Sequence, residues 1–364
     1  MEAATLMYQN NSSDGTVSAV NDIIRSVAIV GSGVAGLTAG VLLQAQGHDV
    51  TLFEKSRGPG GRLSAKRVAG TSVDMGGQYF TARNPDFLPF LRQHAGEQTV
   101  VPWHGQLGYQ QDNGDWSEFP AEPRYVGAPR MTAISRGLSE GLNVQAQTRV
   151  ARLHRDSQVK KWHLQDTDGQ NLGAFDQVII TAPPAQAREL LADSSAAQLA
   201  TELNTAVSQI LPCWAVAVKF STNPWPRFQG ARVANSPLFW VADNTSKPGR
   251  ENASDESAAG HWWVLHATPE WTNAHVDDDP QQVVDALMVA FAELSGNAEP
   301  ALETLTHRWL YARSDAGGEP QPGHLWFASE QLGLAGDWLA GGRIEGAYNS
   351  AAGLVDAIGG SEQA

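Results

Sequence analysis

A glycine-rich loop near the start of the chain has the spacing of a dinucleotide-binding turn. Its glycines, Gly31, Gly33 and Gly36, follow the apolar, β-branched segment Ser26 to Val30 and open a small-residue helix predicted over Val34 to Gln46. In such a loop the first glycine permits a tight turn, the second lets the backbone approach a diphosphate, and the third lets the helix pack closely on the strand. The free N–H groups at the helix start can then bind the diphosphate.

An acidic residue follows at the distance that such a site requires. The next predicted strand, Asp49 to Phe53, ends at Glu54, 18 residues after Gly36. A carboxylate at that point accepts hydrogen bonds from the adenosine ribose hydroxyls and disfavours a 2′-phosphate. A glycine-rich helix start is weak evidence by itself. The order strand, loop, helix, strand and acid, however, predicts a parallel βαβ unit that binds a dinucleotide.

Three further segments favour FAD over NAD as that dinucleotide. A second glycine loop follows Glu54 directly, paired glycines lie where a flat ring can rest on the backbone, and a strand-end acid precedes the last helix. The acid, Asp337, can bind ribityl hydroxyls, and the helix start beyond it can stabilise negative charge on a reduced flavin. Gly336 and Asp337 alone are equally well interpreted as an ordinary turn and N-cap. The cofactor ligands predicted in these segments are Lys55, Gly61, Arg62, Gly77, Gln78, Gly336, Asp337, Arg343 and Ile344.

Taken together, these residues resemble the FAD-dependent oxidoreductases of the glutathione-reductase-2 and amine-oxidase superfamily, and more closely the bacterial renalases. The resemblance runs from about Ser26 to Ile358 and includes the stretches EKSRGPGGR, VDMGGQYFTAR, PCWAVAV, SKPGR, WVLHAT and HRWLYAR. The last four stretches lie outside the cofactor motifs, so they are the specific part of the resemblance.

The resemblance implies a flavoprotein oxidase with a p-hydroxybenzoate hydroxylase-like fold and non-covalently bound FAD. Such enzymes take a hydride from 1,2-dihydro isomers of NAD(P)H, form NAD(P)+ and return the electrons to O2 as hydrogen peroxide. It also implies FAD contacts at the matching positions, which are Gly31, Gly33, Gly36, Glu54, Arg62, Gln78, Asp337 and, through its backbone, Val150.

The substrate pocket of such an oxidase needs aromatic and polar anchors rather than a general base, because a dihydronicotinamide already carries a reactive hydride. We expect its ring to be held over the flavin by Tyr79, Trp240, His266, Trp309 and Arg313. Each has a structural alternative. Tyr79 can pack on the flavin edge, the tryptophans and His266 can be core residues, and Arg313 can form a surface ion pair.

Two other functions remain open on the same fold. One is an amine oxidase or another small-molecule FAD-dependent oxidoreductase. In such relatives a lysine often serves near the flavin, and Lys219 or Lys247 would have to take that place. The other is a carrier protein without flavin chemistry, against which the complete set of glycines and Asp337 argues.

The order of the predicted elements indicates an α/β protein with a Rossmann-like FAD-binding domain and a mixed-sheet substrate domain. Antiparallel strands are expected over Val144 to His154, Lys161 to Asp166 and Ala174 to Thr181. We expect a discontinuous FAD-binding domain of residues 25–82, 137–200 and 318–360, and a substrate domain of residues 83–136 and 201–317.

Composition limits the partners and the compartment. In the 364 residues, 25 Lys and Arg against 39 Asp and Glu give a net charge of −14, which argues against a nucleic-acid or anionic-membrane partner. The single cysteine, Cys213, excludes an internal disulfide and a CxxC motif, so we expect a cytoplasmic protein. Residues 1–21 lack the basic and apolar regions of a signal peptide, and a disordered leader is expected over residues 1–24. The histidines show no metal-binding spacing.

Overall fold

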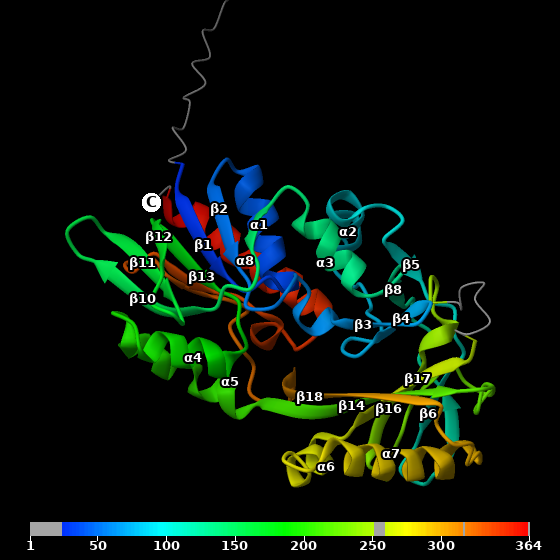
Figure 1. Cartoon of the computed structure of the whole chain (residues 1–364). Helices are drawn as coiled ribbons and strands as arrows, with labels where there is room; N and C mark the ends of the chain where they lie inside the picture. The colour runs from blue at the N-terminus through cyan, green and yellow to red at the C-terminus, as the bar shows by residue number, and fades with distance from the viewer. Residues whose placement is uncertain (1–23, 251–258, 316, 363–364) are drawn as a thin grey trace, which may run out of the picture.

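Two β-sheets, each covered by helices, organise the chain (Figure 1). The computed structural model describes residues 24–250, 259–315 and 317–362. The leader expected over residues 1–24 therefore lies, except for Ile24, outside the described residues. None of the helices in the described ranges is long and apolar enough to cross a membrane.

The first sheet has six strands in the order β19-β20-β13-β1-β2-β9. Neighbouring strands are parallel except for β19, which runs antiparallel to β20. The strands are β1 (Ser26–Val30), β2 (Asp49–Phe53), β9 (Asn143–Gln145), β13 (Gln177–Ile180), β19 (Leu325–Phe327) and β20 (Leu332–Leu334). Helix α1 (Val34–Ala45) connects β1 to β2 and ends before Gly47, whose φ is +91°. The predicted βαβ unit is thereby confirmed.

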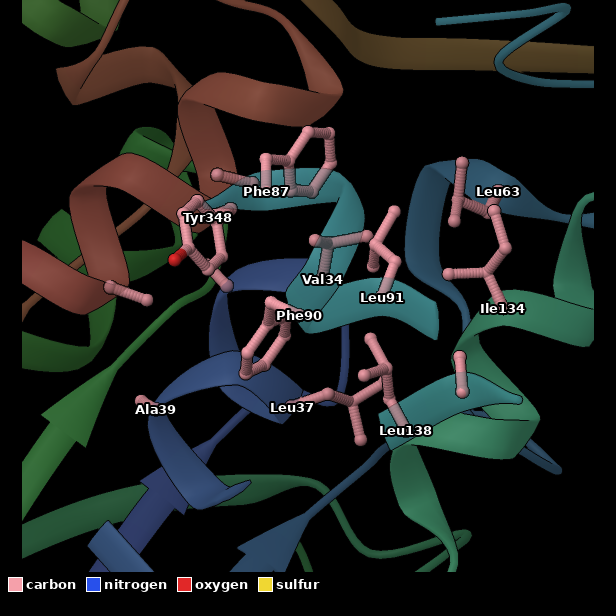
Figure 2. Packing of buried hydrophobic residues seen from close by; sticks show 14 of the residues in the cluster. Val34, Leu37, Ala39, Leu63, Phe87, Phe90, Leu91, Ile134, Leu138 and Tyr348 are labelled. Carbon is pink, nitrogen blue, oxygen red and sulfur yellow. The ribbon is translucent and has the colours of Figure 1, made fainter. Parts of the chain in front are cut away.

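Alternate residues of β1 face opposite sides of the six-stranded sheet, and each side has its own hydrophobic core. Val27 and Ile29 pack with α1 and three further helices, while Ala28 and Val30 pack on the other side. The helices of the first core are α2 (Phe87–Ala95), α3 (Thr132–Ser139) and α8 (Ile344–Glu362), and Figure 2 shows their side chains meeting those of α1. The strand is therefore buried on both faces, as parallel sheets require.

The second core lies under a separate three-stranded antiparallel sheet. Its strands are β10 (Val150–Asp156), β11 (Lys161–Asp166) and β12 (Asn171–Phe175), and helix α4 (Pro184–Ala192) packs beside them. Two predicted strands are corrected here. Val144 to His154 is divided between β9 and β10, and Ala174 to Thr181 between β12 and β13. At the second break the Asp176 carboxylate accepts hydrogen bonds from the Ser26 N–H and hydroxyl, at 2.9 and 2.7 Å.

The other large sheet has seven strands in the order β18-β14-β17-β16-β15-β6-β7. It is mixed, because β15 and β6 are parallel while the other pairs are antiparallel. Its strands are β6 (Leu107–Gln110), β7 (Trp116–Glu118), β14 (Ile210–Phe220), β15 (Gly230–Arg232), β16 (Leu238–Asp243), β17 (His261–Ala267) and β18 (Glu303–Ser314). The Rossmann-like unit and the mixed sheet confirm the predicted fold class, whereas the exact domain boundaries stay a prediction.

Helix α7 (Pro280–Ser295) packs on one face of the mixed sheet through Val283 and Leu287. The opposite face of the mixed sheet packs against Val73 in β4 and Met75 just after it. The remaining elements are β3 (Ala65–Val68), β4 (Thr71–Asp74), β5 (Val100–Pro102), β8 (Tyr125–Gly127), α5 (Asn204–Ser208), α6 (Pro269–Ala274) and short 3-10 turns at 61–63, 197–203, 244–246 and 337–339.

Gly137 lets α3 touch α2, and we predict that Gly137→Ala destabilises the fold. A Cβ on Gly137 would lie 2.2 Å from the Ala95 carbonyl oxygen. Overpacking of this kind typically lowers the free energy of unfolding by about 1–3 kcal/mol, which chemical denaturation would measure. The control is Gly359→Ala in α8, where a Cβ meets nothing within 4 Å and helix propensity favours alanine by up to ~1 kcal/mol. Equal stabilities of the two variants would contradict the prediction.

Candidate active site

A cavity of about 1250 Å³ opens at the carboxyl ends of β1, β2, β13 and β20. Its wall on the opposite side includes residues 307–312 of β18, so both large sheets contribute. Ligands of open parallel sheets bind at the carboxyl ends of the strands. Small-molecule sites usually measure about 300–1,000 Å³, so this cavity has room for a dinucleotide and a second molecule.

The first glycine loop forms the part of the cavity below α1. Gly31 has a φ of +106°, and a Cβ on Gly36 would lie 2.1 Å from the Gly31 carbonyl oxygen. Gly33 lines the cavity, and a Cβ there would meet nothing within 4 Å. It is also the N-cap of α1 and provides no side-chain cap, so the first N–H groups of the helix are available to a ligand. This open, uncapped helix start fits a diphosphate.

Glu54 lies beside that loop, where β2 ends. Its carboxylate is buried and accepts hydrogen bonds from the Ser32 N–H and hydroxyl, at 3.1 and 2.8 Å, and from the Ser56 N–H at 2.8 Å. These contacts fix the carboxylate in the cavity wall, and it keeps acceptor capacity for a ribose hydroxyl. The next residue, Lys55, also lines the cavity, and burial lowers its pKa.

The second glycine loop meets the C-terminal segment through an ion pair. Gly60 N–H donates to the Ser32 carbonyl at 3.1 Å, which joins the two glycine loops. Arg62 forms a two-pronged ion pair with Asp337, in which Nη1 lies 2.9 Å from Oδ2. Both side chains line the cavity between its two ends, and they offer a cation and a carboxylate that fit a diphosphate and hydroxyl groups respectively.

Helix α8 begins at the same cavity. Arg343 and Ile344 line it, so the positive end of the helix dipole points at a bound ligand. In the first turn, the Glu345 carboxylate accepts the N–H groups of Arg83 and Asn84 at 2.6 and 2.5 Å. These bonds attach the segment that follows Tyr79 to the helix start.

The turn from Asp74 to Tyr79 contributes to the cavity wall, and side chains packed against the turn bind its carbonyl groups. The Met75 carbonyl accepts hydrogen bonds from His266 Nε2 at 3.2 Å and Trp309 Nε1 at 3.0 Å. Burial lowers the pKa of His266 to about 4, so its ring is neutral and donates from Nε2. Gly77 and Tyr79 are the residues of this turn that face the cavity.

Three aromatic side chains of the cavity wall are contacted by guanidinium groups. Arg124 Cζ lies 4.9 Å from the Phe119 ring centroid and 5.6 Å from that of Tyr79. The Cζ atoms of Arg313 and Arg232 lie 3.7 and 3.9 Å from the centroid of the Phe239 ring. The three aromatic residues line the cavity, as does Arg124. Arg124 Nε is buried and, among the described residues, has no hydrogen-bond partner.

Most of the predicted cofactor ligands meet at this cavity. The predicted ligands that line it are Gly31, Gly33, Glu54, Lys55, Gly61, Arg62, Gly77, Val150, Gly336, Asp337, Arg343 and Ile344. Gly36 lies behind the loop, where it allows close packing, and the side chain of Gln78 points away from the cavity, toward Lys247.

The predicted substrate residues divide into two groups. Tyr79 and Trp309 line the cavity. The other three lie behind its wall: the ring centroid of Trp240 is 5.3 Å from that of Tyr79, His266 binds the Met75 carbonyl, and Arg313 covers Phe239. Such positions let them support the wall, but they do not place them against a substrate.

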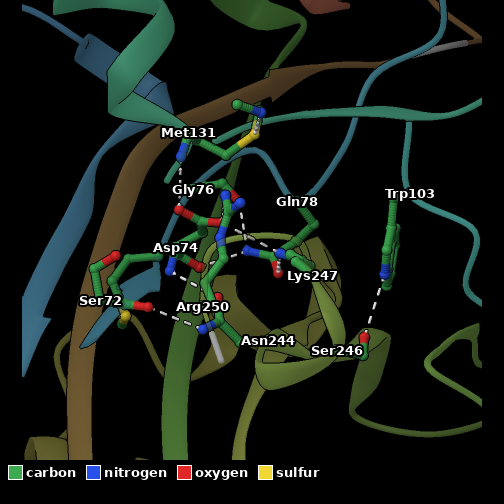
Figure 3. Close-up of polar contacts among 12 residues, drawn as sticks. Ser72, Asp74, Gly76, Gln78, Trp103, Met131, Asn244, Ser246, Lys247 and Arg250 are labelled. Atoms are coloured by element: carbon green, nitrogen blue, oxygen red, sulfur yellow. Dashed lines mark hydrogen bonds and ion pairs between the residues drawn. The ribbon is translucent and has the colours of Figure 1, made fainter. Parts of the chain in front are cut away.

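A buried ionic cluster behind the turn was not predicted. It consists of Asp74, Lys247 and Arg250, whose side chains have no exposed surface (Figure 3). Its only sequence signal is the stretch SKPGR, which places two cations close together in an acidic chain. Composition gives no indication that a carboxylate more than 170 positions away pairs with them.

Neither the cysteine nor a metal cluster forms part of the described site. Cys213 does not line the cavity; it is buried in β14, and burial raises its pKa to about 12. Over residues 24–250, 259–315 and 317–362, no group of three or more His, Cys, Asp or Glu side chains is placed to hold a metal ion.

Two family profiles match the chain. The profile described as flavin containing amine oxidoreductase matches residues 122–358, and that of an NAD(P)-binding Rossmann-like domain matches residues 29–94. A hydroxyneurosporene desaturase of Rubrivivax gelatinosus is 49% identical over 57 residues, which are 16% of this chain. The chain spans only 11% of the length of that curated relative.

Solved structures show the same fold over nearly the whole chain. A cyclohexylamine oxidase from Brevibacterium oxydans aligns with a TM-score of 0.68 at 13% identity, covering 94% of this chain and 100% of that chain. A protein from Exiguobacterium, provisionally named a protoporphyrinogen oxidase, aligns with a TM-score of 0.70 at 14% identity, covering 92% of this chain and 98% of that chain. At such identities the likeness establishes the fold alone.

Gly33→Ala is predicted to separate cofactor binding from folding. The backbone of Gly33 has a φ of −72°, which alanine adopts readily, and its Cβ would enter open cavity space. The variant should therefore unfold at the wild-type temperature without cofactor but bind FAD at least ~10-fold more weakly, the equivalent of about 1.4 kcal/mol. Flavin titration of the apoprotein measures this affinity. The matched control is Gly58→Ala. A Cβ on Gly58 also meets nothing within 4 Å, but Gly58 does not line the cavity. Wild-type affinity in Gly33→Ala would contradict the assignment of the diphosphate to this loop.

Proposed function

Because the chain belongs to the flavin containing amine oxidoreductase family, we propose that it is an FAD-dependent oxidase of 1,2-dihydro isomers of NAD(P)H. FAD is its cofactor, and when bound it accepts two electrons from the substrate and passes them to O2. In the proposed reaction a hydride leaves the dihydronicotinamide, which becomes NAD(P)+. Overall, O2 takes up that hydride and one proton from water and becomes hydrogen peroxide.

The guanidinium-covered aromatic wall is the observation that carries this proposal. The rings of Tyr79, Phe119 and Phe239 are each contacted by an arginine, with 3.7–5.6 Å between the arginine Cζ and the ring centroid. A protonated amine entering this region would meet the like charge of Arg124, which lines the cavity, with Arg232 and Arg313 behind Phe239. A dihydronicotinamide dinucleotide instead brings a neutral ring and anionic phosphates, and the positive charge of Arg124, which lines the cavity, attracts such phosphates.

Carboxylates that line the cavity near this wall are already engaged. Glu122 forms an ion pair with Arg83 at 2.8 Å, and Glu345 accepts two backbone N–H groups. They therefore do not supply a free negative charge for an ammonium group, which favours the dihydronicotinamide over an amine.

The residues of the wall have positioning roles in the proposed reaction. Burial raises the pKa of Tyr79, so its phenol stays protonated and acts as a neutral surface rather than a base. Trp309 donates its indole N–H to the Met75 carbonyl, and this hydrogen bond fixes the plane of the indole ring at the cavity edge. Together with Phe239 these rings exclude water from the reacting atoms.

An amine or another small molecule is the second candidate substrate. It is supported by the family itself and by the likeness of fold to a cyclohexylamine oxidase. The lysines named above for an amine oxidase do not support it, since neither Lys219 nor Lys247 lines the cavity.

An anaerobic substrate screen tests the two candidates directly. The FAD-loaded protein should lose its yellow colour when mixed rapidly with 1,2-dihydro-NAD(P) and regain it in air, with one hydrogen peroxide formed per NAD(P)+. Primary amines should leave the absorbance unchanged. Bleaching by an amine alone would reject the proposal, and fastest bleaching by ordinary 1,4-NADH would replace it with an NADH oxidase.

Arg124→Gln is predicted to weaken binding of the substrate more than binding of the cofactor. Loss of the guanidinium charge that lines the cavity should raise KM for the anionic dihydronicotinamide dinucleotide about 10-fold, the size of one charge-assisted contact, with FAD affinity unchanged. Steady-state oxygen consumption measures KM and kcat separately. Arg92→Gln, which removes a solvent-exposed arginine paired with Glu97 at 3.8 Å, is the control. An unchanged KM in Arg124→Gln would remove Arg124 from the substrate site.

A further inference from the structure

The buried cluster behind the Asp74–Tyr79 turn holds more cations than its carboxylate requires. Asp74 Oδ2 is contacted by Arg250 Nη2 at 2.6 Å and by Arg250 Nε at 3.2 Å, while Oδ1 accepts the Met131 N–H at 3.0 Å. These contacts neutralise and satisfy the carboxylate without a second cation. Lys247 Nζ lies farther away, at 3.4 Å from Oδ2.

Burying Lys247 as a cation has a desolvation cost, which contacts with Asp74, Gln78 and the Trp103 ring oppose. Its side chain has no exposed surface, and burial lowers its pKa to about 8 even though Asp74 opposes that shift. The other charged groups that act on it are Arg250, which lowers the pKa further, and Asp243, which raises it. Because Arg250 already pairs with Asp74, the charge of that carboxylate is balanced without this lysine.

The shortest polar contact of Lys247 is with Gln78. Lys247 Nζ donates to Gln78 Oε1 at 2.9 Å, and Gln78 Nε2 donates to the carbonyls of Asp74 and Gly76 at 2.6 and 3.0 Å (Figure 3). Only one orientation of the amide satisfies all three contacts. Rotated by half a turn, its NH2 group would face the ammonium and its oxygen would face two carbonyl oxygens. Lys247 and the two carbonyls therefore hold the amide in this orientation together.

This amide in turn determines which way the cavity wall faces. The carbonyls of Asp74 and Gly76 are drawn toward Gln78, and that of Met75 toward His266 and Trp309. The Gly77 N–H donates to the Arg62 carbonyl at 2.9 Å. Gly77 lines the cavity together with the apolar side chains of Ile344 and Leu63, and a flat ring can rest against this surface.

We propose that Lys247 is a positioning residue of the flavin site, which acts by locking the Gln78 amide so that the Asp74 and Gly76 carbonyls stay turned away from the bound ring. The inference rests on the proposed place of the ring beside Gly77 and Tyr79, but not on the identity of the substrate. Lys247 does not touch the cavity, so its effect passes through Gln78.

The test compares Lys247→Met with the matched control Lys219→Met. Lys219 is also a buried lysine, 8% exposed and in β14, and does not line the cavity. In Lys247→Met, the apoprotein should still fold, because Asp74 keeps its ion pair with Arg250 while Gln78 Oε1 loses its donor. Its FAD dissociation constant should rise about 10-fold, as for the loss of one charge-assisted hydrogen bond, and the visible spectrum of bound FAD should shift. Lys219→Met should change neither flavin property.

A double-mutant cycle keeps the proposal falsifiable. Gln78→Leu should reproduce the loss of affinity and the spectral shift, and adding Lys247→Met to it should cause no further loss, because both changes remove the same contact. Additive losses, or a Lys247→Met protein that is less stable but binds FAD with wild-type affinity and spectrum, would overturn it. These readouts need no substrate, so a failed dihydronicotinamide screen with normal flavin binding rejects the proposed function and leaves this inference standing.

Discussion

The close approach of α1 to β1 and β13 is the constraint on which the cavity depends. Only a hydrogen atom fits between Gly36 and the Gly31 carbonyl, since a Cβ would lie 2.1 Å from that oxygen. Thr181 secures the loop by donating its hydroxyl to the carbonyls of Val30 and Gly31, at 3.0 and 3.1 Å. The start of α1 thereby lies over the carboxyl edge of the sheet, and the open space at Gly33 becomes available to a dinucleotide.

The parts of the fold that sequence reasoning predicted are those fixed by local geometry. Three glycines, a small-residue helix and Glu54 define the first βαβ unit within about 30 residues, a span typical of such units. The divisions between β9 and β10 and between β12 and β13 were missed, because both halves of each segment favour strands. Which sheet a strand joins depends on distant partners such as Ser26 for Asp176, and no local pattern contains that information.

The candidate site shows the same limit at the level of single side chains. Trp240, His266 and Arg313 were chosen for their chemistry, but residue type does not tell which side of a wall a side chain occupies. Asp74 and Lys247 are separated by 173 positions and meet only because the β4 region packs on the mixed sheet. The buried cluster is therefore evident only from the three-dimensional structure, although both of its cations lie in the stretch SKPGR.

The placement of α8 at the end of the chain has a consequence for biosynthesis. The ribosome makes β1 and α1 first, whereas Asp337 and the start of α8 follow only after most of the protein has emerged. At about 5–20 residues per second the interval is roughly 15–60 s. During it, the apolar faces that α8 later covers, including Leu37 and Phe90, lack their partner. The residues that line the cavity are therefore brought together only after Asp337 and the start of α8 have been made, and until then the apolar side chains that α8 covers lack this partner.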